Sequence, residues 1–247
     1  MAIYFLSDLH LRDSESAATL RFCSFLNHEV KVSDTLILGG DVFDLFVGNK
    51  QVFLDRFSNI LRALESLGRS GTNILYLEGN HDFHLEAAFQ EMPGVRVFRG
   101  SYSAEIEGVK VCVSHGDEID REDYGYRFLR FITRAWLFQI FLRIMPGAWL
   151  AALGNWSSDK SRKYNGVERQ NTAAVDRTKR LFREFAAAQV SAGVRFVFLG
   201  HSHIRDHECF PGGAEYVNLG YSSQELLYAR YSPPGEGLQL LRYTAVN

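Results

Sequence analysis

Histidine, aspartate and asparagine follow five short apolar runs of the sequence, often next to glycine. The five segments are Asp8-Leu9-His10, Gly39-Gly40-Asp41-Val42-Phe43-Asp44, Gly79-Asn80-His81-Asp82, Ser114-His115-Gly116-Asp117 and Gly200-His201-Ser202-His203. Each segment alone has an ordinary explanation, since Asp-x-His can cap a turn and Gly-Asn tolerates the positive φ of a tight turn. Together they hold five of the eight histidines, and this concentration favours one shared site.

The donors in these segments are imidazole nitrogen and carboxylate or amide oxygen, without thiolate. This mixture suits manganese, iron or zinc and contains too much nitrogen for a dedicated calcium site. Two divalent cations about 3.5–4 Å apart can share one carboxylate, activate water and neutralise charge on phosphoryl oxygens. The set therefore predicts an enzyme that hydrolyses a phosphate ester or anhydride. The alternative is a non-catalytic scaffold that binds proteins, and such a protein should have lost metal ligands.

A buried strand is predicted ahead of each segment. The strands lie at Ile3–Leu6, Thr35–Leu38, 74–77, 109–113 and Phe196–Leu199, with a sixth at 216–219. Helix-like segments at 17–27, 51–67 and 172–190 alternate with them. This alternation favours an α/β architecture with helices covering the sheet faces. The tail, 226–231 and 238–243, predicts a closing hairpin. Because sites in such proteins gather at the carboxyl ends of strands, we expect the five segments to converge.

Composition limits the class of protein. The 247 residues, 46% hydrophobic and 23% charged, predict one globular domain over residues 1–247. A net charge of -2 gives no basic field, so we expect no nucleic-acid partner. Cys23, Cys112 and Cys209 are far apart and indicate free thiols in a reducing cytosol. The sequence begins without a basic leader and has no run of 18 apolar residues, so we expect a cytoplasmic protein.

Residues 121–165 depart from the strand–helix alternation and predict a helical cap insertion. Between Tyr124 and Ser158 there are four arginines, no acidic residue and a high density of aromatic and aliphatic residues. One interpretation is a helical hairpin that packs on itself and breaks at Pro146-Gly147. The other, which we favour, is a hydrophobic chamber for acyl chains whose basic aromatic rim contacts an anionic membrane surface. The aliphatic excess disfavours binding of single-stranded nucleic acid.

The order of the five segments resembles the calcineurin-like metallophosphoesterase family, from Asp8 to His203. The family pattern is D-x-H, G-D-x-x-D, G-N-H-D, H-G and G-H-x-H. The resemblance implies a two-sheet sandwich flanked by helices and a site for two divalent metal ions. The implied ligands are Asp8, His10, Asp41 and His203 for one metal, and Asp41, Asn80, His115 and His201 for the other.

The same resemblance implies roles beside the metals. Asp41 is the bridging ligand, and His81 contacts the phosphate and can protonate the leaving oxygen. Both are therefore implied catalytic residues. Asp44 and Asp82 are implied to orient histidines from behind the ligands. A purely structural role for His81, as a hydrogen-bond partner of Asp44 or Asp82, is an alternative that can coexist with the catalytic one.

A narrower resemblance, to the UDP-2,3-diacylglucosamine diphosphatases of lipid A biosynthesis, rests on segments that flank the insertion. These are His115-Gly116-Asp117, Asp123-Tyr124-Gly125-Tyr126-Arg127-Phe128, Asn155-Trp156-Ser157 and Ser161-Arg162. The resemblance implies hydrolysis of a UDP-linked diacylated sugar to UMP and 2,3-diacylglucosamine 1-phosphate. The usual metal is Mn²⁺, with iron or zinc as alternatives, and the implied location is the inner face of the cytoplasmic membrane, in peripheral contact.

Several substrate contacts follow from this narrower resemblance. The implied substrate-binding residues are Asn80, His81, Asp123, Ser161, Arg162 and Asn165. The sequence also departs from the family, because some members have arginine at the position of His81. The alternative function is therefore a metallophosphoesterase with another substrate, such as a nucleotide or another phosphoester.

Overall fold

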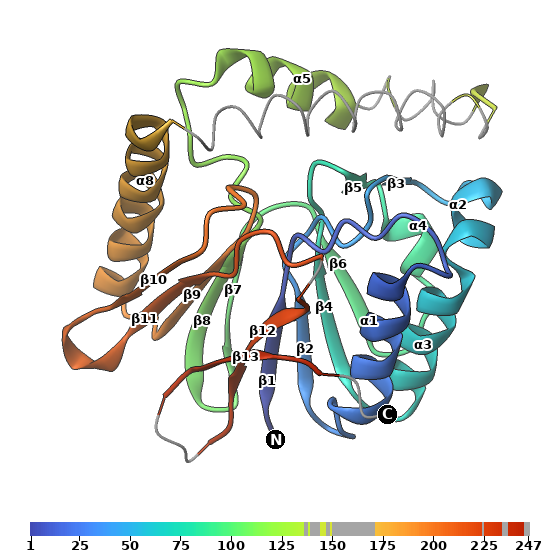
Figure 1. Ribbon diagram of the computed structural model, residues 1–247, viewed down its shortest axis with the longest axis horizontal. Coiled ribbons are helices and arrows are strands. Elements are labelled where there is room, and N and C mark those ends of the chain that lie inside the picture. The colour runs from blue at the N-terminus through green and yellow to red at the C-terminus, as the bar shows by residue number, and fades with distance from the viewer. Residues whose placement is uncertain are drawn as a thin grey trace.

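A computed structural model describes residues 1–135, 138, 144–146, 149, 171–223, 225–233 and 237–244. Within these ranges two large sheets face each other, with helices α1 and α3 covering one outer face and helix α8 the other (Figure 1). This arrangement confirms the predicted α/β sandwich flanked by helices. Every helix in the described ranges falls short of the length and apolarity that crossing a membrane requires.

The described strands form a six-stranded, a five-stranded and a two-stranded sheet. The six-stranded sheet has the order β13 (Gln239–Arg242), β12 (Leu227–Tyr231), β1 (Ile3–Leu6), β2 (Thr35–Leu38), β4 (Asn73–Leu77) and β6 (Val95–Phe98). The five-stranded sheet has the order β10 (Asp206–Cys209), β11 (Glu215–Asn218), β9 (Phe196–Leu199), β8 (Val109–Ser114) and β7 (Tyr102–Ile106). The small sheet pairs β3 (Phe46–Val47) with β5 (Asp82–Phe83).

The helices connect and cover these strands. They are α1 (Ala17–His28), α2 (Gln51–Arg56), α3 (Ser58–Arg69), α4 (Glu86–Phe89), α5 (Tyr124–Arg134) and α8 (Thr172–Ser191), with a 3₁₀ turn η1 at Pro211–Gly213. Ser16 caps α1 by accepting from Thr19 N, and Asn171 caps α8 by accepting from Ala173 N and Ala174 N. The helix expected at 51–67 is divided, because Phe57 leaves helical geometry between α2 and α3.

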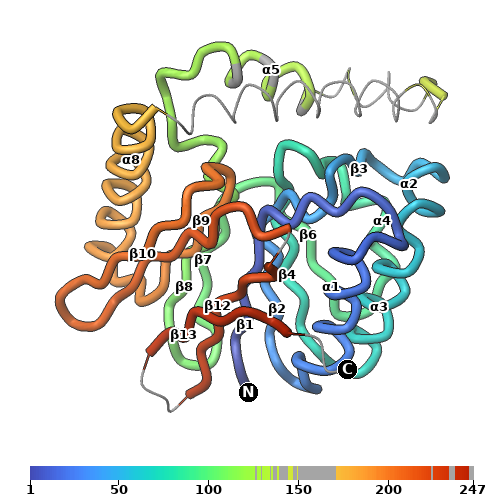
Figure 2. The backbone as a smooth tube through the Cα atoms, in the orientation of Figure 1, coloured from blue at the N-terminus to red at the C-terminus, as the bar shows by residue number. Residues whose placement is uncertain are grey.

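Parallel pairing brings the ends of the central strands to one side of the molecule. β1, β2, β4 and β6 run parallel in one sheet, and β8, β9 and β11 run parallel in the other. Figure 2 shows that the first residues of the chain lie at the opposite end of the molecule from α5. Arg130 of α5 is bonded to Asp117 in the loop after β8. The loops that carry the candidate ligands therefore lie between the sandwich and α5.

Three apolar layers hold the elements together. Phe5 and Phe198 stack between the two sheets with ring centroids 4.7 Å apart. Phe22 and Phe25 of α1 lie in the layer beneath the six-stranded sheet, and Phe182 of α8 lies in the layer outside the five-stranded sheet. Each aromatic ring buries a large apolar area, so the strand ends rest on a rigid base.

The predicted domain limits reach beyond what the structure describes. Of the insertion predicted at 121–165, the described part is 121–135 with residues 138, 144–146 and 149. One domain over 1–247 with this insertion stays a prediction. Ser161, Arg162 and Asn165 lie outside the described residues.

Candidate metal centre

The five segments singled out in the sequence converge at one end of the sandwich. Loops after β1, β2 and β4 bring Asp8, Asp41 and Asn80 from the six-stranded sheet. Loops after β8 and β9 bring His115 and His201 from the five-stranded sheet. The site is therefore assembled across the two sheets, because neither sheet alone supplies the full donor set.

The first donor group contains Asp8, His10, Asp41 and His203, whose donor atoms all lie within 4.8 Å of one another. Nε2 of His10 is 3.0 Å from Nε2 of His203 and 3.7 Å from Oδ2 of Asp41. Nε2 of His203 is 3.3 Å from Oδ1 of Asp8. Two imidazoles and two carboxylates at these separations surround one cation-sized position, and they are the four residues predicted for the first metal.

The second donor group meets at the side-chain oxygen of Asn80. Oδ1 of Asn80 is 3.0 Å from Nε2 of His115 and 2.9 Å from Nδ1 of His201. Nε2 of His115 is also 3.5 Å from Oδ2 of Asp41. The same Asp41 oxygen thus borders both groups, which is the position a bridging carboxylate takes between two cations.

The backbone at the candidate ligands has an unusual conformation. Of nine non-glycine residues with positive φ in the described part of the chain, five are candidate ligands: Asp8, His10, Asp41, His201 and His203. Their φ angles lie between 45° and 65°. Left-handed backbone is costly for residues that carry a Cβ, and such strain concentrates at functional sites. This backbone signal supports the ligand set independently of residue type.

Asp8 provides a direct test of whether the site suits a metal. Its side chain is fully buried, and Oδ1 accepts a hydrogen bond from His201 N at 2.9 Å. Oδ2 has no hydrogen-bond partner among the described residues. Gly200 packs against this oxygen so closely that a Cβ there would lie 2.6 Å from it. A buried carboxylate oxygen without a donor is costly, and a cation in the first group would satisfy it.

Two histidines have their ring orientation fixed by backbone carbonyls. Nδ1 of His115 donates to Gly39 O at 2.9 Å, which leaves Nε2 facing Asp41 and Asn80. Nδ1 of His81 donates to Asp44 O at 2.8 Å, so Nε2 is the nitrogen left to hold or give a proton. A carbonyl oxygen can only accept, and it therefore sets the tautomer of each ring.

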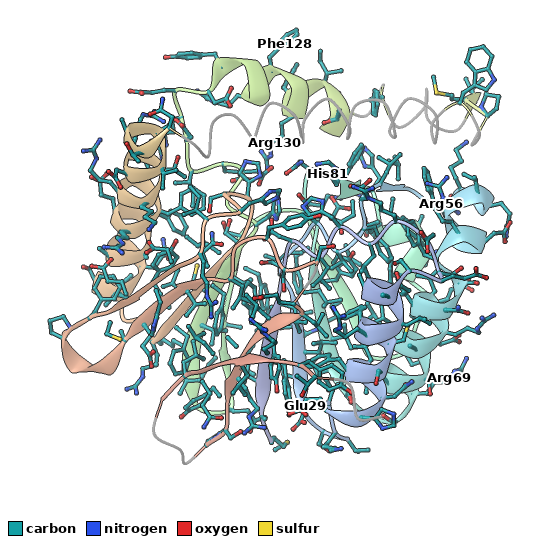
Figure 3. The ribbon with its side chains drawn as sticks, viewed as in Figure 1. Glu29, Arg56, Arg69, His81, Phe128 and Arg130 are labelled. Carbon is teal, nitrogen blue, oxygen red and sulfur yellow. The ribbon has the colours of Figure 1, made fainter. Side chains whose placement is uncertain are left out.

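His81 lies beside the first donor group rather than within it. Its ring centroid is 4.9 Å from that of His10, and the planes are nearly perpendicular. His81 N donates to Oδ1 of Asp41 at 2.9 Å, which leaves Oδ2 to the two donor groups. Figure 3 shows His81 at the end of the sandwich that faces α5. This placement suits contact with a phosphate held at the centre.

The two carboxylates expected behind the ligands act on different partners. Oδ1 of Asp44 is 3.9 Å from Nδ1 of His10, and the backbone carbonyl of Asp44 holds His81. The carboxylate of Asp82 accepts hydrogen bonds from backbone N–H groups and from the hydroxyl of Tyr76. These include Asp41 N at 2.9 Å, so Asp82 supports the loop that carries the bridging residue.

Burial and mutual charge shift the pKa values of the centre. Burial lowers the pKa of His10 to about 3 and that of His201 to about 4. Burial also opposes protonation of His115, but the adjacent charge of Asp41 outweighs it and raises the pKa of His115 to about 10. Burial and the Asp41 charge raise the pKa of Asp82 to about 7. The charge of Asp41 therefore favours the protonated form of His115, while burial favours the neutral form of His10 and His201.

Helix α5 is anchored to the loop after β8 and to the segment that follows β5. Nε of Arg130 donates to Oδ2 of Asp117 at 2.8 Å, and its guanidinium also contacts Glu118. Nε2 of His84 donates to Thr133 O at 2.8 Å. In Figure 3 Arg130 points from α5 toward the sandwich and Phe128 points away from it. The helix therefore bridges the loop after β8 and the segment after β5.

The predicted substrate contacts are only partly covered by the described residues. Asn80 and His81 lie in the centre, as set out above. Asp123 immediately precedes α5, is exposed, and accepts a hydrogen bond from Arg127 N through its backbone oxygen. Its role in substrate binding stays a prediction.

Sequence reasoning missed a sixth loop, between β11 and β12. The ring of Tyr221 stacks on His10 with centroids 5.5 Å apart and lies equally close to His203. Asn218 donates to Gly200 O at 2.8 Å and to Ser202 Oγ at 3.1 Å. The sequence predicts only that a strand at 216–219 ends next to this loop. The loop has no typical metal ligand that would have indicated its place in the site.

The family comparison agrees with this geometry. Residues 1–205 match the model of the calcineurin-like phosphoesterases, and the chain belongs to that family. Members use a dinuclear metal centre, and the two donor groups are its candidate in this chain. The protein is a metal-dependent phosphoesterase.

Individual relatives have a more specific name. The chain is 28% identical over 247 residues to a UDP-2,3-diacylglucosamine hydrolase from Aeromonas hydrophila, with 96% of each chain covered. It is 26% identical over 221 residues to a protein of the same name from Ralstonia nicotianae, covering 87% of this chain and 82% of the relative. A solved E. coli phosphoesterase, Yfce, is 13% identical with a TM-score of 0.43, covering 94% of this chain and 89% of the other.

Proposed function

We propose that the protein hydrolyses the pyrophosphate bond of UDP-2,3-diacylglucosamine to give UMP and 2,3-diacylglucosamine 1-phosphate, a step of lipid A biosynthesis. The observation that carries the reaction type is the pair of donor groups that share Oδ2 of Asp41. Support for the substrate comes from two relatives that have that hydrolase name and that align with 87% and 96% of this chain.

In this proposal each residue of the centre has a separate role in hydrolysis. Two bound cations, Mn²⁺ in this proposal, supply Lewis acidity and activate water. Asp8, His10, Asp41, Asn80, His115, His201 and His203 hold them. His81, with Nδ1 bound to Asp44 O, keeps Nε2 to contact the phosphate and to protonate the departing oxygen. Asp82 fixes the backbone of Asp41 and so the position of the shared carboxylate.

The insertion supplies the lipid-binding part of the proposal. The described helix α5 exposes Tyr124, Phe128 and Phe131, while Arg130 anchors its other side. We assign acyl-chain binding to the 121–165 region and sugar or phosphate contacts to Asp123, Ser161, Arg162 and Asn165. An exposed aromatic face beside arginines also suits contact with an anionic membrane, so we place the enzyme at the inner face of the cytoplasmic membrane.

A direct assay tests this function. Protein loaded with Mn²⁺ should release UMP from UDP-2,3-diacylglucosamine, measured by chromatography, and a chelator should abolish release. Asp41→Ala should abolish it as well, because both donor groups lose their shared oxygen. Metal-loaded protein that leaves this substrate intact would contradict the proposal.

A second candidate function is hydrolysis of another phosphoester, such as a nucleotide. The observation that favours it is His81 itself, since some diphosphatases have arginine at this position. Under this alternative, the protein would cleave generic phosphodiesters rapidly, and replacing apolar residues of 121–165 with smaller ones would hardly change kcat/KM. A large loss of kcat/KM on the lipid substrate alone would exclude it.

A further inference from the structure

A second cluster of metal-binding side chains lies on the edge of the five-stranded sheet, apart from the catalytic centre. It consists of His207 and Cys209 on β10 and Glu215 on β11, whose donor atoms all lie within 4.8 Å of one another. β11 pairs in parallel with β9, with Glu215 opposite Phe196 at the start of that strand. The cluster is therefore at the end of the sheet opposite to the catalytic loops.

The strand register makes the three side chains share one face. His207 and Cys209 are two residues apart on β10, and Cys209 is paired with Glu215 in the antiparallel ladder. Alternate residues of a strand point to the same face, and directly paired residues do so as well. The backbone register therefore places the three side chains next to one another on one face of the β10–β11 pair.

The separation of His207 and Cys209 fits one tetrahedral cation. Nε2 of His207 is 2.9 Å from Oε2 of Glu215 and 3.7 Å from Sγ of Cys209. With usual zinc–sulfur and zinc–nitrogen bonds, a tetrahedral site separates sulfur from nitrogen by about 3.6 Å and nitrogen from oxygen by about 3.4 Å. A shift of the carboxylate oxygen by about 0.5 Å would bring the nitrogen–oxygen distance to the tetrahedral value as well.

The carboxylate is held in place from the other sheet. Oε1 of Glu215 accepts a hydrogen bond from Leu238 N at 3.1 Å, just before β13, while Oε2 faces His207. The side chains of Glu215 and His207 are 12% and 35% exposed, and Cys209 is exposed. A cation here would thus keep one position for water and would link the β10–β11 pair to the segment that leads into β13.

We propose that His207, Cys209 and Glu215 form a zinc site that stabilises the edge of the sandwich. Binding would displace the thiol proton of Cys209 to solvent, leaving the thiolate as ligand. A thiolate donor favours Zn²⁺ or Co²⁺ over Mn²⁺, whereas the catalytic centre has only nitrogen and oxygen donors. The two sites should therefore select different metals in the same chain.

Cobalt absorption tests the site, because sulfur-to-cobalt charge transfer arises only where a thiolate is a ligand. Metal-stripped, full-length protein in a phosphine reductant is titrated with Co²⁺. The wild type should show the near-ultraviolet charge-transfer band, Cys209→Ser should abolish it, and His207→Gln should weaken it. Cys23→Ser, a matched thiol control, should keep it. Zn²⁺ should remove the band at concentrations at which Mn²⁺ does not.

Three outcomes would overturn the proposal. The first is a wild type without the band, and the second is a band that persists in Cys209→Ser. The third is a band whose intensity per protein falls when the protein is diluted at a fixed, saturating Co²⁺ concentration, since the cation would then bridge two copies. Phosphoesterase activity with Mn²⁺ should be the same in Cys209→Ser and wild type. Zn²⁺ should raise the Tm of the wild type more than that of Cys209→Ser.

Discussion

At the scale of single residues, the centre depends on how each carboxylate oxygen is used. Oδ1 of Asp41 accepts from His81 N, and Oδ2 borders both donor groups. Asp82 supports this arrangement from below, because it binds the N–H groups of Asp41, Val42 and Gly79. The position of the shared oxygen therefore depends on a residue that would touch neither metal.

Asp82→Asn tests this support. The amide can no longer accept from every N–H that the carboxylate binds, so one donor is left without a partner. We expect a 10- to 100-fold loss of metal affinity or activity, about the usual effect of residues behind the ligands. Asp206→Asn is the matched control, because Asp206 is also buried but its carboxylate pairs with Arg183 and not with the loop that carries Asp41. Equal metal affinity in wild type and Asp82→Asn would contradict the role.

His81 has a separate prediction. If it protonates the leaving oxygen, His81→Ala should lower kcat by about 10²- to 10⁴-fold. The fall of wild-type activity at alkaline pH should disappear in the variant, because the lost group is the acid. The measurement is kcat against pH for both proteins with saturating Mn²⁺. An unchanged alkaline fall would assign proton donation to another group.

At the scale of elements, the strands of the core could be predicted, whereas the edges could not. Ile3–Leu6 and Phe196–Leu199 are short, fully apolar and buried, so their sequences indicate strands directly. β10 has the sequence Asp-His-Glu-Cys, and β6 is only partly buried. Such strands form because a neighbour offers backbone hydrogen bonds, and that partner is not visible in the local sequence.

The candidate ligands could also be predicted from the sequence, whereas the residues that pack around them could not. The seven candidate ligands stood out because their types are those that metals bind, and the structure brings them together. Tyr221 and the target of Asp82 could not be predicted. The contact of Tyr221 with His10 depends on how two distant loops pack, and Asp82 acts through backbone N–H groups that any residue supplies.

The prediction at the scale of elements concerns Arg130, which anchors helix α5. Arg130→Gln removes the ion pair with the buried Asp117, at a cost of about 1.5–3 kcal/mol. We expect KM for the lipid substrate to rise while metal content stays at the wild-type level, since α5 bridges loops but supplies no ligand. Arg127→Gln is the control, because the guanidinium of the exposed Arg127 donates to Arg121 O and not to the loop that carries His115. A loss of metal in Arg130→Gln would contradict this division.

At the scale of the whole molecule, folding brings buried carboxylates together, and bound cations would neutralise their charge. Asp8 and Asp41 are buried at the junction of the two sheets. In the metal-free protein the pKa of His115 is raised to about 10, because Asp41 attracts its proton. Metal binding must expel that proton, since the neutral ring is the ligand.

The pH dependence of metal affinity follows with a defined sign. Below pH 10 His115 holds a proton that the metal must displace, so the apparent affinity for Mn²⁺ should rise about tenfold per pH unit between pH 6 and pH 8. Titration calorimetry in buffers of different ionisation enthalpy would show proton release when the metal binds. Affinity that does not change with pH would contradict the protonation of His115.

The most direct test of the central claim is a crystal structure of the protein grown with excess Mn²⁺, with the ions located by anomalous scattering. The account predicts two peaks about 3.5–4 Å apart, with Oδ2 of Asp41 between them. Asp8, His10 and His203 should surround one peak, and Asn80, His115 and His201 the other. A single peak, or ions that leave Asp41 unbound, would contradict it.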